Sequence, residues 1–214
     1  VAVGFRRQGE NDLGRINGRL NARLAFADTL FGHGVVQLFQ KLHFVICVPA
    51  DAFATIAQHI QAAQHTIQMA ALTFDNWPLA QQLIAASQRG VAVTVLLEGE
   101  PVGGMDDQEK YVCQQLEAAG GACWFMIRDD AASIQDRYRF YHAKYMILDG
   151  NIGLVSSENF SPRSFPDDDK SDGTLGHRGV VLLTDAPTVV VHLQTLFARD
   201  LDPANHQDLF RWQA

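Results

Sequence analysis

One stretch, residues 141–160, restricts the possible folds of the chain more than any other. His142 and Lys144 are two positions apart, so a β-strand would place their side chains on the same face. A run of apolar residues follows them, and a second apolar run comes after Asp149-Gly150-Asn151, a sequence typical of a turn. The stretch therefore predicts two adjoining strands with an imidazole and an amine at one end.

The second predicted strand leads into a polar segment that completes this group of side chains. Ser157 and Asn159 again share one parity, and they follow the apolar residues directly. A lysine supplies positive charge, serine and asparagine supply hydrogen bonds, and histidine acts as a nucleophile or proton carrier. We therefore predict that His142, Lys144, Ser157 and Asn159 converge on the oxygens of one phosphoryl group.

The carboxylates of this stretch do not suggest a metal site. Only Asp149 and Glu158 are anionic, which is too few for a hard cation that prefers several oxygen ligands. Asp149 has the opposite parity to His142, so a regular strand directs it to the other face. We therefore predict no metal and assign Asp149 the structural role of fixing the hairpin.

The spacing of these residues resembles a known signature, the HKD motif of the phospholipase D superfamily. The motif is H-x-K, four residues, D, six residues, a small residue and then S-x-N. Here it comprises His142, Lys144, Asp149, Ser156, Ser157 and Asn159. The family usually has glycine where this chain has Ser156. Flanking segments extend the resemblance from about residue 48 to residue 200 and are similar to bacterial or archaeal phospholipase D-like domains of the cardiolipin-synthase type.

The resemblance implies a mechanism in which a histidine attacks phosphorus and forms a covalent phosphohistidine. It makes His142 the nucleophile or its acid partner, while Lys144, Ser157 and Asn159 hold the non-bridging oxygens. In the family, a second histidine from another HKD copy protonates the leaving oxygen. This chain contains one H-x-K only. The second copy is therefore expected from a homodimer or from a missing half of a longer protein.

Four further residues are weaker candidates for phosphate or substrate contacts: Ser156, Glu158, Glu98 and Arg178. A nucleophilic histidine also needs an acceptor that orients its other ring nitrogen. Glu158, the aspartates within residues 167–172 and Glu98 are alternatives for this acceptor, and the sequence does not choose among them. His177, beside Arg178, is a further possible phosphate contact.

The rest of the chain predicts an α/β domain with a layered mixed β-sheet flanked by helices on both faces, equivalent to one HKD half. Predicted strands and helices alternate along it. The strands cover 44–48, 66–74, 91–97, 122–126 and 179–183, and the helices cover 52–64, 78–88, 106–119 and 185–201. Residues 1–45 are interpreted as a leader or helical extension, and residues 46–214 as the phospholipase D-like domain.

The net charge and the composition exclude some classes of function. The formal net charge of −7 does not suit a protein that coats duplex DNA with a broad basic face. No apolar run reaches the length of a membrane span, and the compartment stays open between cytoplasmic and exported. The three cysteines are scattered, so we interpret them as buried free thiols.

Three functions remain in competition. The first is a metal-independent, cofactor-free phosphodiesterase or phosphatidyltransferase that acts on phospholipids, favoured by the acidic charge and the cardiolipin-synthase-like flanks. The second is a metal-independent nuclease of the same superfamily, favoured by the small size and the single motif. The third is a non-catalytic HKD half that supports a partner domain.

Overall fold

The computed structural model describes residues 42–46, 49–167 and 176–212. Its described part contains one mixed sheet with the strand order β1-β7-β6-β5-β2-β3-β4-β8. The strands are β1 (Leu42–Ile46), β2 (Thr66–Ala71), β3 (Ala92–Glu98), β4 (Ala122–Met126), β5 (Lys144–Leu148), β6 (Ile152–Ser156), β7 (Val180–Thr184) and β8 (Leu209–Arg211). The helices are α3 (Pro49–Ala62), α4 (Trp77–Gln88), α5 (Asp107–Ala118) and α6 (Pro187–Asp200).

The centre of the sheet joins a parallel half to an antiparallel half. Strands β2, β3 and β4 are parallel neighbours, and β8 closes their edge in the antiparallel direction. Strand β5 lies antiparallel to β2, forms a hairpin with β6, and β7 pairs with the other side of β6. The predicted hairpin is confirmed, and it lies in the interior of the sheet.

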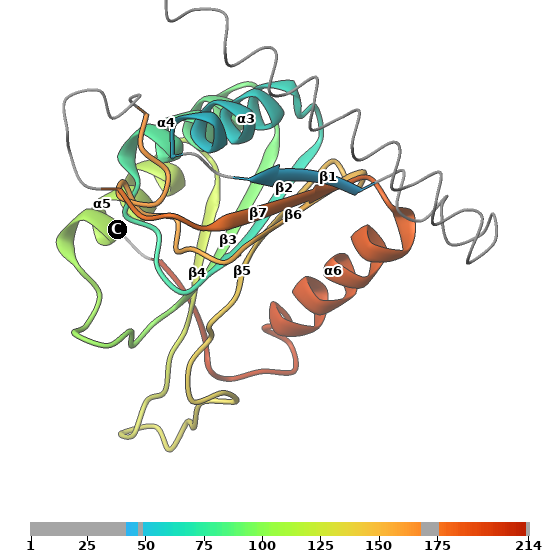
Figure 1. Cartoon of the computed structure of the whole chain (residues 1–214). Coiled ribbons are helices and arrows are strands. Elements are labelled where there is room, and N and C mark those ends of the chain that lie inside the picture. The colour runs from blue at the N-terminus through green and yellow to red at the C-terminus, as the bar shows by residue number, and fades with distance from the viewer. Residues whose placement is uncertain (1–41, 47–48, 168–175, 213–214) are drawn as a thin grey trace, which may run out of the picture. The chain divides into compact units, whose positions relative to one another are not determined.

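Helices cover both faces of the sheet, with α3, α4 and α5 on one side and α6 on the other (Figure 1). Every residue of β5 is buried, and alternate residues enter different layers. Met146 and Leu148 join the core beneath α3, α4 and α5, while Tyr145 and Ile147 join the core beneath α6. The predicted class, a layered mixed sheet with helices on both faces, is confirmed.

Sequence signals located most helices within a few residues. Asn76 caps α4 by accepting the Leu79 N–H, with Pro78 in the first turn, and Asp106 caps α5 by accepting the Glu109 N–H. Helix α3 instead begins at Pro49, before the predicted start at residue 52. Residues 1–41, the larger part of the predicted leader, lie outside the described residues.

The cysteines require a correction. Cys113 on α5 and Cys123 on β4 form a disulfide with Cα atoms 5.5 Å apart, and both side chains are buried. The interpretation of both as free thiols is therefore wrong. The helix and strand are connected by a tight turn at Gly120-Gly121, which brings the two residues together, and the spacing alone did not reveal this. Cys47 lies outside the described residues.

None of the helices among the described residues has the length and apolar character needed to cross a membrane.

Candidate active site

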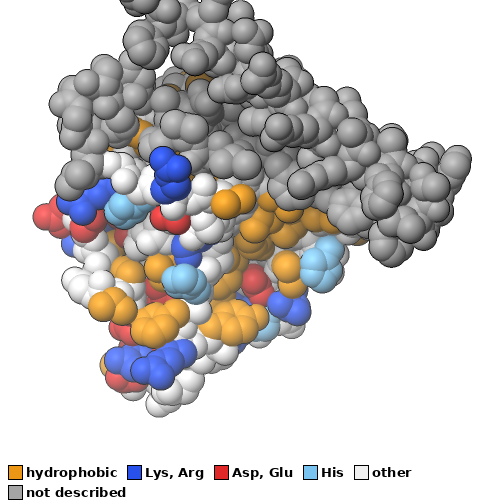
Figure 2. Space-filling view, viewed as in Figure 1, with side chains coloured by type: hydrophobic (Ala, Val, Ile, Leu, Met, Phe, Trp, Pro, Cys, Tyr) orange, Lys and Arg blue, Asp and Glu red, His pale blue; other side chains and the backbone are white. Residues whose placement is uncertain are grey.

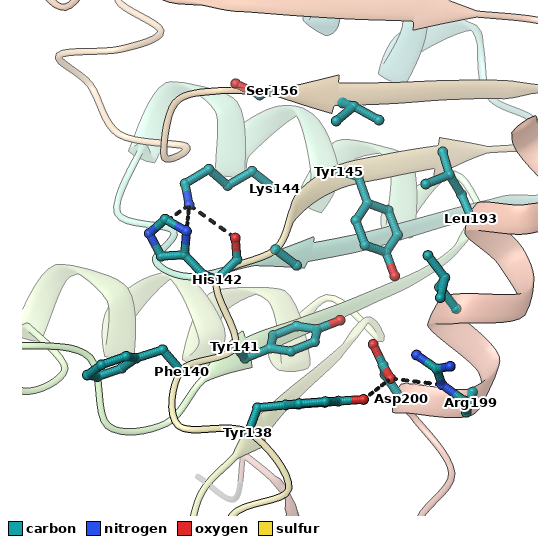
Figure 3. Close-up of a pocket in the computed structure, with 13 residues that line it drawn as sticks. Tyr138, Phe140, Tyr141, His142, Lys144, Tyr145, Ser156, Leu193, Arg199 and Asp200 are labelled. Atoms are coloured by element: carbon teal, nitrogen blue, oxygen red, sulfur yellow. Dashed lines mark hydrogen bonds and ion pairs between the residues drawn. The ribbon is translucent and has the colours of Figure 1, made fainter.

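His142 and Lys144 lie side by side at the start of β5. The strand begins at Lys144, so His142 precedes it in irregular backbone rather than on the predicted strand. The Lys144 Nζ atom is nonetheless 3.2 Å from Nδ1 and 3.3 Å from Nε2 of His142, and it donates to the His142 carbonyl at 3.2 Å (Figure 3). The imidazole is exposed, whereas the lysine is 9% exposed.

Burial perturbs the lysine. Loss of hydration lowers the pKa of the Lys144 ammonium, and the nearby Glu158 carboxylate raises it by a smaller amount. The net result is a pKa below the usual lysine range. The amine is therefore a poorly hydrated cation that an anionic ligand could stabilise.

These two side chains open onto a cavity of about 250 Å³. Its lining contains all four predicted phosphate-binding side chains together with residues from the following loop: His142, Lys144, Ser157, Glu158, Asn159, Ser161, Ser164 and His177. A water molecule occupies roughly 30 Å³ of liquid, so the cavity has room for a phosphoryl group. The four predicted side chains lie at or next to the open end of the β5–β6 hairpin, where the start of β5 and the end of β6 are neighbours.

Ser157 and Asn159 differ in how their polar atoms are occupied. The Ser157 Oγ accepts the Val180 N–H at 3.0 Å and donates to Glu158 Oε1 at 3.3 Å. The Asn159 Oδ1 is buried and has no hydrogen-bond partner among the described residues. Buried polar atoms are normally paired, so this oxygen retains the capacity to accept a hydrogen bond.

Asp149 lies away from this cavity, at the opposite end of the hairpin. Its carboxylate accepts the backbone N–H groups of Gln64, His65 and Thr66 at 2.7–2.9 Å. Partial burial opposes ionisation, but these bonds lower the pKa of Asp149 below its usual value. Through these hydrogen bonds, Asp149 holds the hairpin turn against the residues that lead into β2.

Ser156 does not line the cavity either. Its Oγ accepts the Glu158 N–H at 2.9 Å and donates to the Glu158 carbonyl at 3.0 Å. The hydroxyl that replaces the usual glycine therefore folds back onto the local turn and does not crowd the cavity. Ser156 instead lines a second, adjoining cavity that His142 and Lys144 also line, and its predicted phosphate contact stays a prediction.

Glu98 and Arg178 are also outside the cavity lining. Glu98 is 5% exposed, and its carboxylate accepts the N–H groups of Tyr141 and Glu100. It supports the backbone before His142, and its carboxylate forms its hydrogen bonds with these N–H groups and not with the His142 ring. Arg178 is exposed, and the residue that enters the cavity lining is its neighbour His177.

No carboxylate among the described residues forms a hydrogen bond with the His142 ring; Glu158 lines the same cavity, Asp167 is exposed, and residues 168–172 are outside the described part. His177, Ser161 and Ser164 line the cavity without being members of the motif. The sequence marked His177 only as a possible phosphate contact, and nothing in it distinguished Ser161 and Ser164.

A larger cavity of about 510 Å³ adjoins the first, and His142 and Lys144 line both. Its walls are mainly aromatic and aliphatic. Tyr138, Tyr141, Tyr145 and Leu193 lie on the side of Arg199 and Asp200, and Phe140 lies on the side of His142 (Figure 3). Burial raises the pKa of the Tyr145 hydroxyl to about 12 and raises that of Tyr141 as well. Both phenols are therefore neutral at ordinary pH.

The visible face carries mixed side chains. In Figure 2, hydrophobic side chains gather across the middle and right of its described part, with basic, acidic and histidine side chains around and among them. No group of three or more His, Cys, Asp or Glu able to hold a metal ion is present among the described residues. The predicted absence of a metal stays a prediction.

Comparison with known proteins identifies related sequences. The family described as the phospholipase D-like domain of cardiolipin synthase matches residues 56–201. A mitochondrial cardiolipin hydrolase of Xenopus laevis is 25% identical over 159 residues, which are 73% of this chain. The match spans 65% of that relative's length.

Solved structures share the fold. NucT from Helicobacter pylori superposes with a TM-score of 0.61 at 17% identity, over 74% of this chain and 94% of NucT. Nuc from Salmonella typhimurium, a phospholipase D family member, gives a TM-score of 0.63 at 14% identity, over 81% of this chain and 98% of Nuc.

Proposed function

Because the chain belongs to the family of phospholipase D-like domains of the cardiolipin-synthase type, we propose that it is a phosphodiesterase that forms a phosphohistidine on His142. The observation that carries the proposal is the shared lining of one cavity. His142, Lys144, Ser157 and Asn159 all reach it, from two adjoining strand ends. This set offers a nucleophile, a cation and hydrogen-bonding groups to a single phosphoryl group.

The side chains divide the work as follows. A ring nitrogen of His142 attacks phosphorus, and the Lys144 ammonium beside the ring moves onto a non-bridging oxygen as negative charge develops. The Asn159 side-chain NH₂ group donates a hydrogen bond to a second oxygen. Water then releases the phosphoryl group in hydrolysis, or an alcohol accepts it in phosphatidyl transfer.

The proposed substrate is a phospholipid head-group phosphodiester. The adjoining cavity is lined by aromatic and aliphatic side chains and shares His142 and Lys144 with the phosphate cavity, which suits an ester with an apolar part. The net charge of −7 and the similarity to a protein named as a cardiolipin hydrolase favour the same class. A single-stranded nucleic acid is the alternative substrate.

The test compares substrates in the absence of divalent metal. The protein is incubated with vesicles of phosphatidylglycerol or phosphatidylcholine and with single-stranded DNA, each with EDTA. We expect hydrolysis or transfer on the lipid, and its loss in His142→Ala. The matched control is His192→Ala, because His192 is an exposed histidine on α6 outside both cavities.

A label transferred from a phosphorus-labelled substrate to His142 would support the covalent step. Cleavage of DNA alone would move the assignment to a nuclease. Full activity in His142→Ala would reject the phosphohistidine. If the wild-type protein neither turns over nor becomes labelled, the chain is a non-catalytic half.

The proposed mechanism also needs a group that protonates the leaving oxygen. The motif provides one histidine, so a second HKD copy in a homodimer, or in another part of a longer protein, is one source.

A further inference from the structure

Glu158 places a carboxylate inside the cavity to which the proposed function assigns an anion. Its side chain is 27% exposed and lines the phosphate cavity together with His142 and Lys144. The carboxylate is close enough to Lys144 to raise the pKa of that ammonium, against the larger effect of burial. A fixed negative charge repels a phosphodiester beside it, so the chemistry of the ligand has to account for Glu158.

Both the backbone and the side chain of Glu158 are held in place. The Ser156 hydroxyl, which stands where the family usually has glycine, accepts the Glu158 N–H at 2.9 Å and donates to its carbonyl at 3.0 Å. The Ser157 hydroxyl donates to Oε1 at 3.3 Å. The side chain also packs against Gly179, where an added Cβ would overlap the Glu158 Cγ. The carboxylate is therefore positioned before a ligand arrives, which favours recognition.

The negative charge of Glu158 has no permanent cationic partner. No lysine or arginine among the described residues forms an ion pair with it, and the ring of His177, at 3.7 Å from Oε2, is charged only when protonated. Lys144 lies beside His142 instead. With both histidines neutral, the charges of Lys144 and Glu158 cancel. A bound phosphodiester therefore adds one uncompensated negative charge to the cavity.

The lining of the phosphate cavity differs from that of the larger cavity beside it. Hydroxyls of Ser161 and Ser164 line it with Glu158, and the described residues of its wall include no phenylalanine, tyrosine or tryptophan. The larger cavity carries the aromatic and aliphatic side chains (Figure 3). His142 lines both cavities. A phosphodiester at His142 would thus extend its apolar ester group into the larger cavity and its head group towards Glu158.

We propose that Glu158 selects a phosphodiester whose head group carries a primary ammonium, as in phosphatidylethanolamine. This inference rests on the proposed function and names the substrate class of the same site. The ammonium supplies the positive charge that the cavity lacks once the phosphodiester is bound. Its three N–H donors match the acceptors in the wall, which are the Glu158 carboxylate and the hydroxyls of Ser161 and Ser164.

Other phosphodiesters complement this cavity less well. The quaternary ammonium of choline has no N–H to donate and is typically bound by aromatic rings, which the described residues of this wall do not provide. The head group of phosphatidylglycerol carries no cation. A nucleic acid strand brings further phosphates and would meet the Glu158 carboxylate with more negative charge.

The experiment compares two esters that differ in the charge of the head group and not in its length. The head group of phosphatidylethanolamine ends in an ammonium, and that of phosphatidylpropanol, made with n-propanol, ends in a methyl group. Both are used as short-chain lipids below the concentration at which micelles form, so that no charged lipid surface contributes. We expect the wild-type kcat/KM to be about 10–100-fold higher for phosphatidylethanolamine.

Three variants test whether this preference comes from Glu158. Glu158→Gln keeps the length of the side chain but removes its charge, so it should cleave the two esters at similar rates. Gly179→Ala displaces the carboxylate without removing it and should also reduce the preference. Glu100→Gln, which alters a carboxylate outside both cavities, is the matched control and should keep the wild-type preference. Circular dichroism of each variant should equal that of the wild type.

The outcomes separate this inference from the function on which it rests. Equal kcat/KM values of the wild type for the two esters would overturn the role of Glu158, and that measurement requires no variant. Equal losses on both esters in Glu158→Gln would also overturn it, because a residue that only holds Lys144 or His142 in place affects both esters alike. Cleavage of DNA alone would overturn it as well. In each case labelled His142 would still support the phosphohistidine, whereas a wild type without turnover or label would overturn both.

Discussion

The carboxylate of Glu98 accepts the backbone N–H of Tyr141, the residue immediately before His142. Its other oxygen accepts the Glu100 N–H at 2.9 Å, and the side chain is 5% exposed. Glu98 is the last residue of β3, so this bond connects the end of a parallel strand to the segment that carries the proposed nucleophile. We therefore expect the position of the imidazole to depend on a carboxylate that bonds to the preceding backbone and not to the ring.

Replacing Glu98 should reduce both stability and activity. Glu98→Ala leaves the buried Tyr141 N–H and the partly buried Glu100 N–H without their acceptor, and hydrogen bonds to charged groups contribute about 1.5–3 kcal/mol each. We expect the free energy of unfolding to fall by about 3 kcal/mol, measured by urea denaturation. We also expect kcat to fall by at least tenfold, because the Tyr141 backbone is released.

The control for this variant is Glu100→Gln, which alters an exposed carboxylate paired with Arg128. It should unfold within about 0.5 kcal/mol of the wild type. If Glu98→Ala lost stability but kept full kcat, the link from Glu98 to the position of His142 would be wrong.

Asp149 should contribute to stability and not to the chemistry. Its three backbone hydrogen bonds fasten the β5–β6 turn to the residues that start β2. Asp149→Ala should lower the free energy of unfolding by about 2 kcal/mol, whereas Asp167→Asn, at an exposed position, should leave it unchanged. Activity per folded molecule should change by less than threefold, because Asp149 is outside the phosphate cavity.

The pH dependence of stability tests the role of Asp149 independently. Its pKa in the folded protein is below the usual value of 3.8, so its contribution is complete above that value and is lost as the pH falls through the folded pKa. Between pH 5 and pH 2, the free energy of unfolding should therefore fall less with decreasing pH in Asp149→Asn than in the wild type, as measured by urea denaturation at each pH. An equal fall in the two proteins would contradict this role.

Local patterns in the sequence predicted the hairpin, since parity and the Asp-Gly turn depend on neighbouring residues only. The partners of Asp149 and Glu98 were beyond such reasoning, because each accepts N–H groups from a segment more than 40 positions away. Parity correctly directed Asp149 away from the cavity but named none of its partners. The contact of His177 with Glu158 was beyond the same reasoning, since it is a tertiary contact.

The Cys113–Cys123 disulfide predicts the number of free thiols. The chain has three cysteines, and two of them are joined, so denatured, unreduced protein should react with one equivalent of a thiol reagent. The reagent should label Cys47, as identified by peptide mass spectrometry. Reduction should expose all three thiols and lower stability by about 2–3 kcal/mol, as expected for a short closed loop. Labelling of three thiols before reduction would contradict the disulfide.

Glu109 should make the protein less stable as the pH rises through neutrality. Its side chain is 2% exposed and accepts the Phe74 N–H at 2.8 Å, and burial, with Asp106 and Asp75 nearby, raises its pKa to about 7. Because the pKa is raised in the folded state, the contribution of Glu109 to the free energy of unfolding is complete below the unfolded pKa of about 4.5 and is lost as the pH rises through 7. The loss amounts to about 3 kcal/mol of stability. Glu109→Gln keeps the acceptor oxygen without the charge, so urea denaturation should find it more stable than the wild type at pH 8 and nearly equal at pH 4.5. Asp107→Asn, an exposed change on the same helix, should show no such crossover, and an equal shift of Glu109→Gln at both pH values would refute the raised pKa.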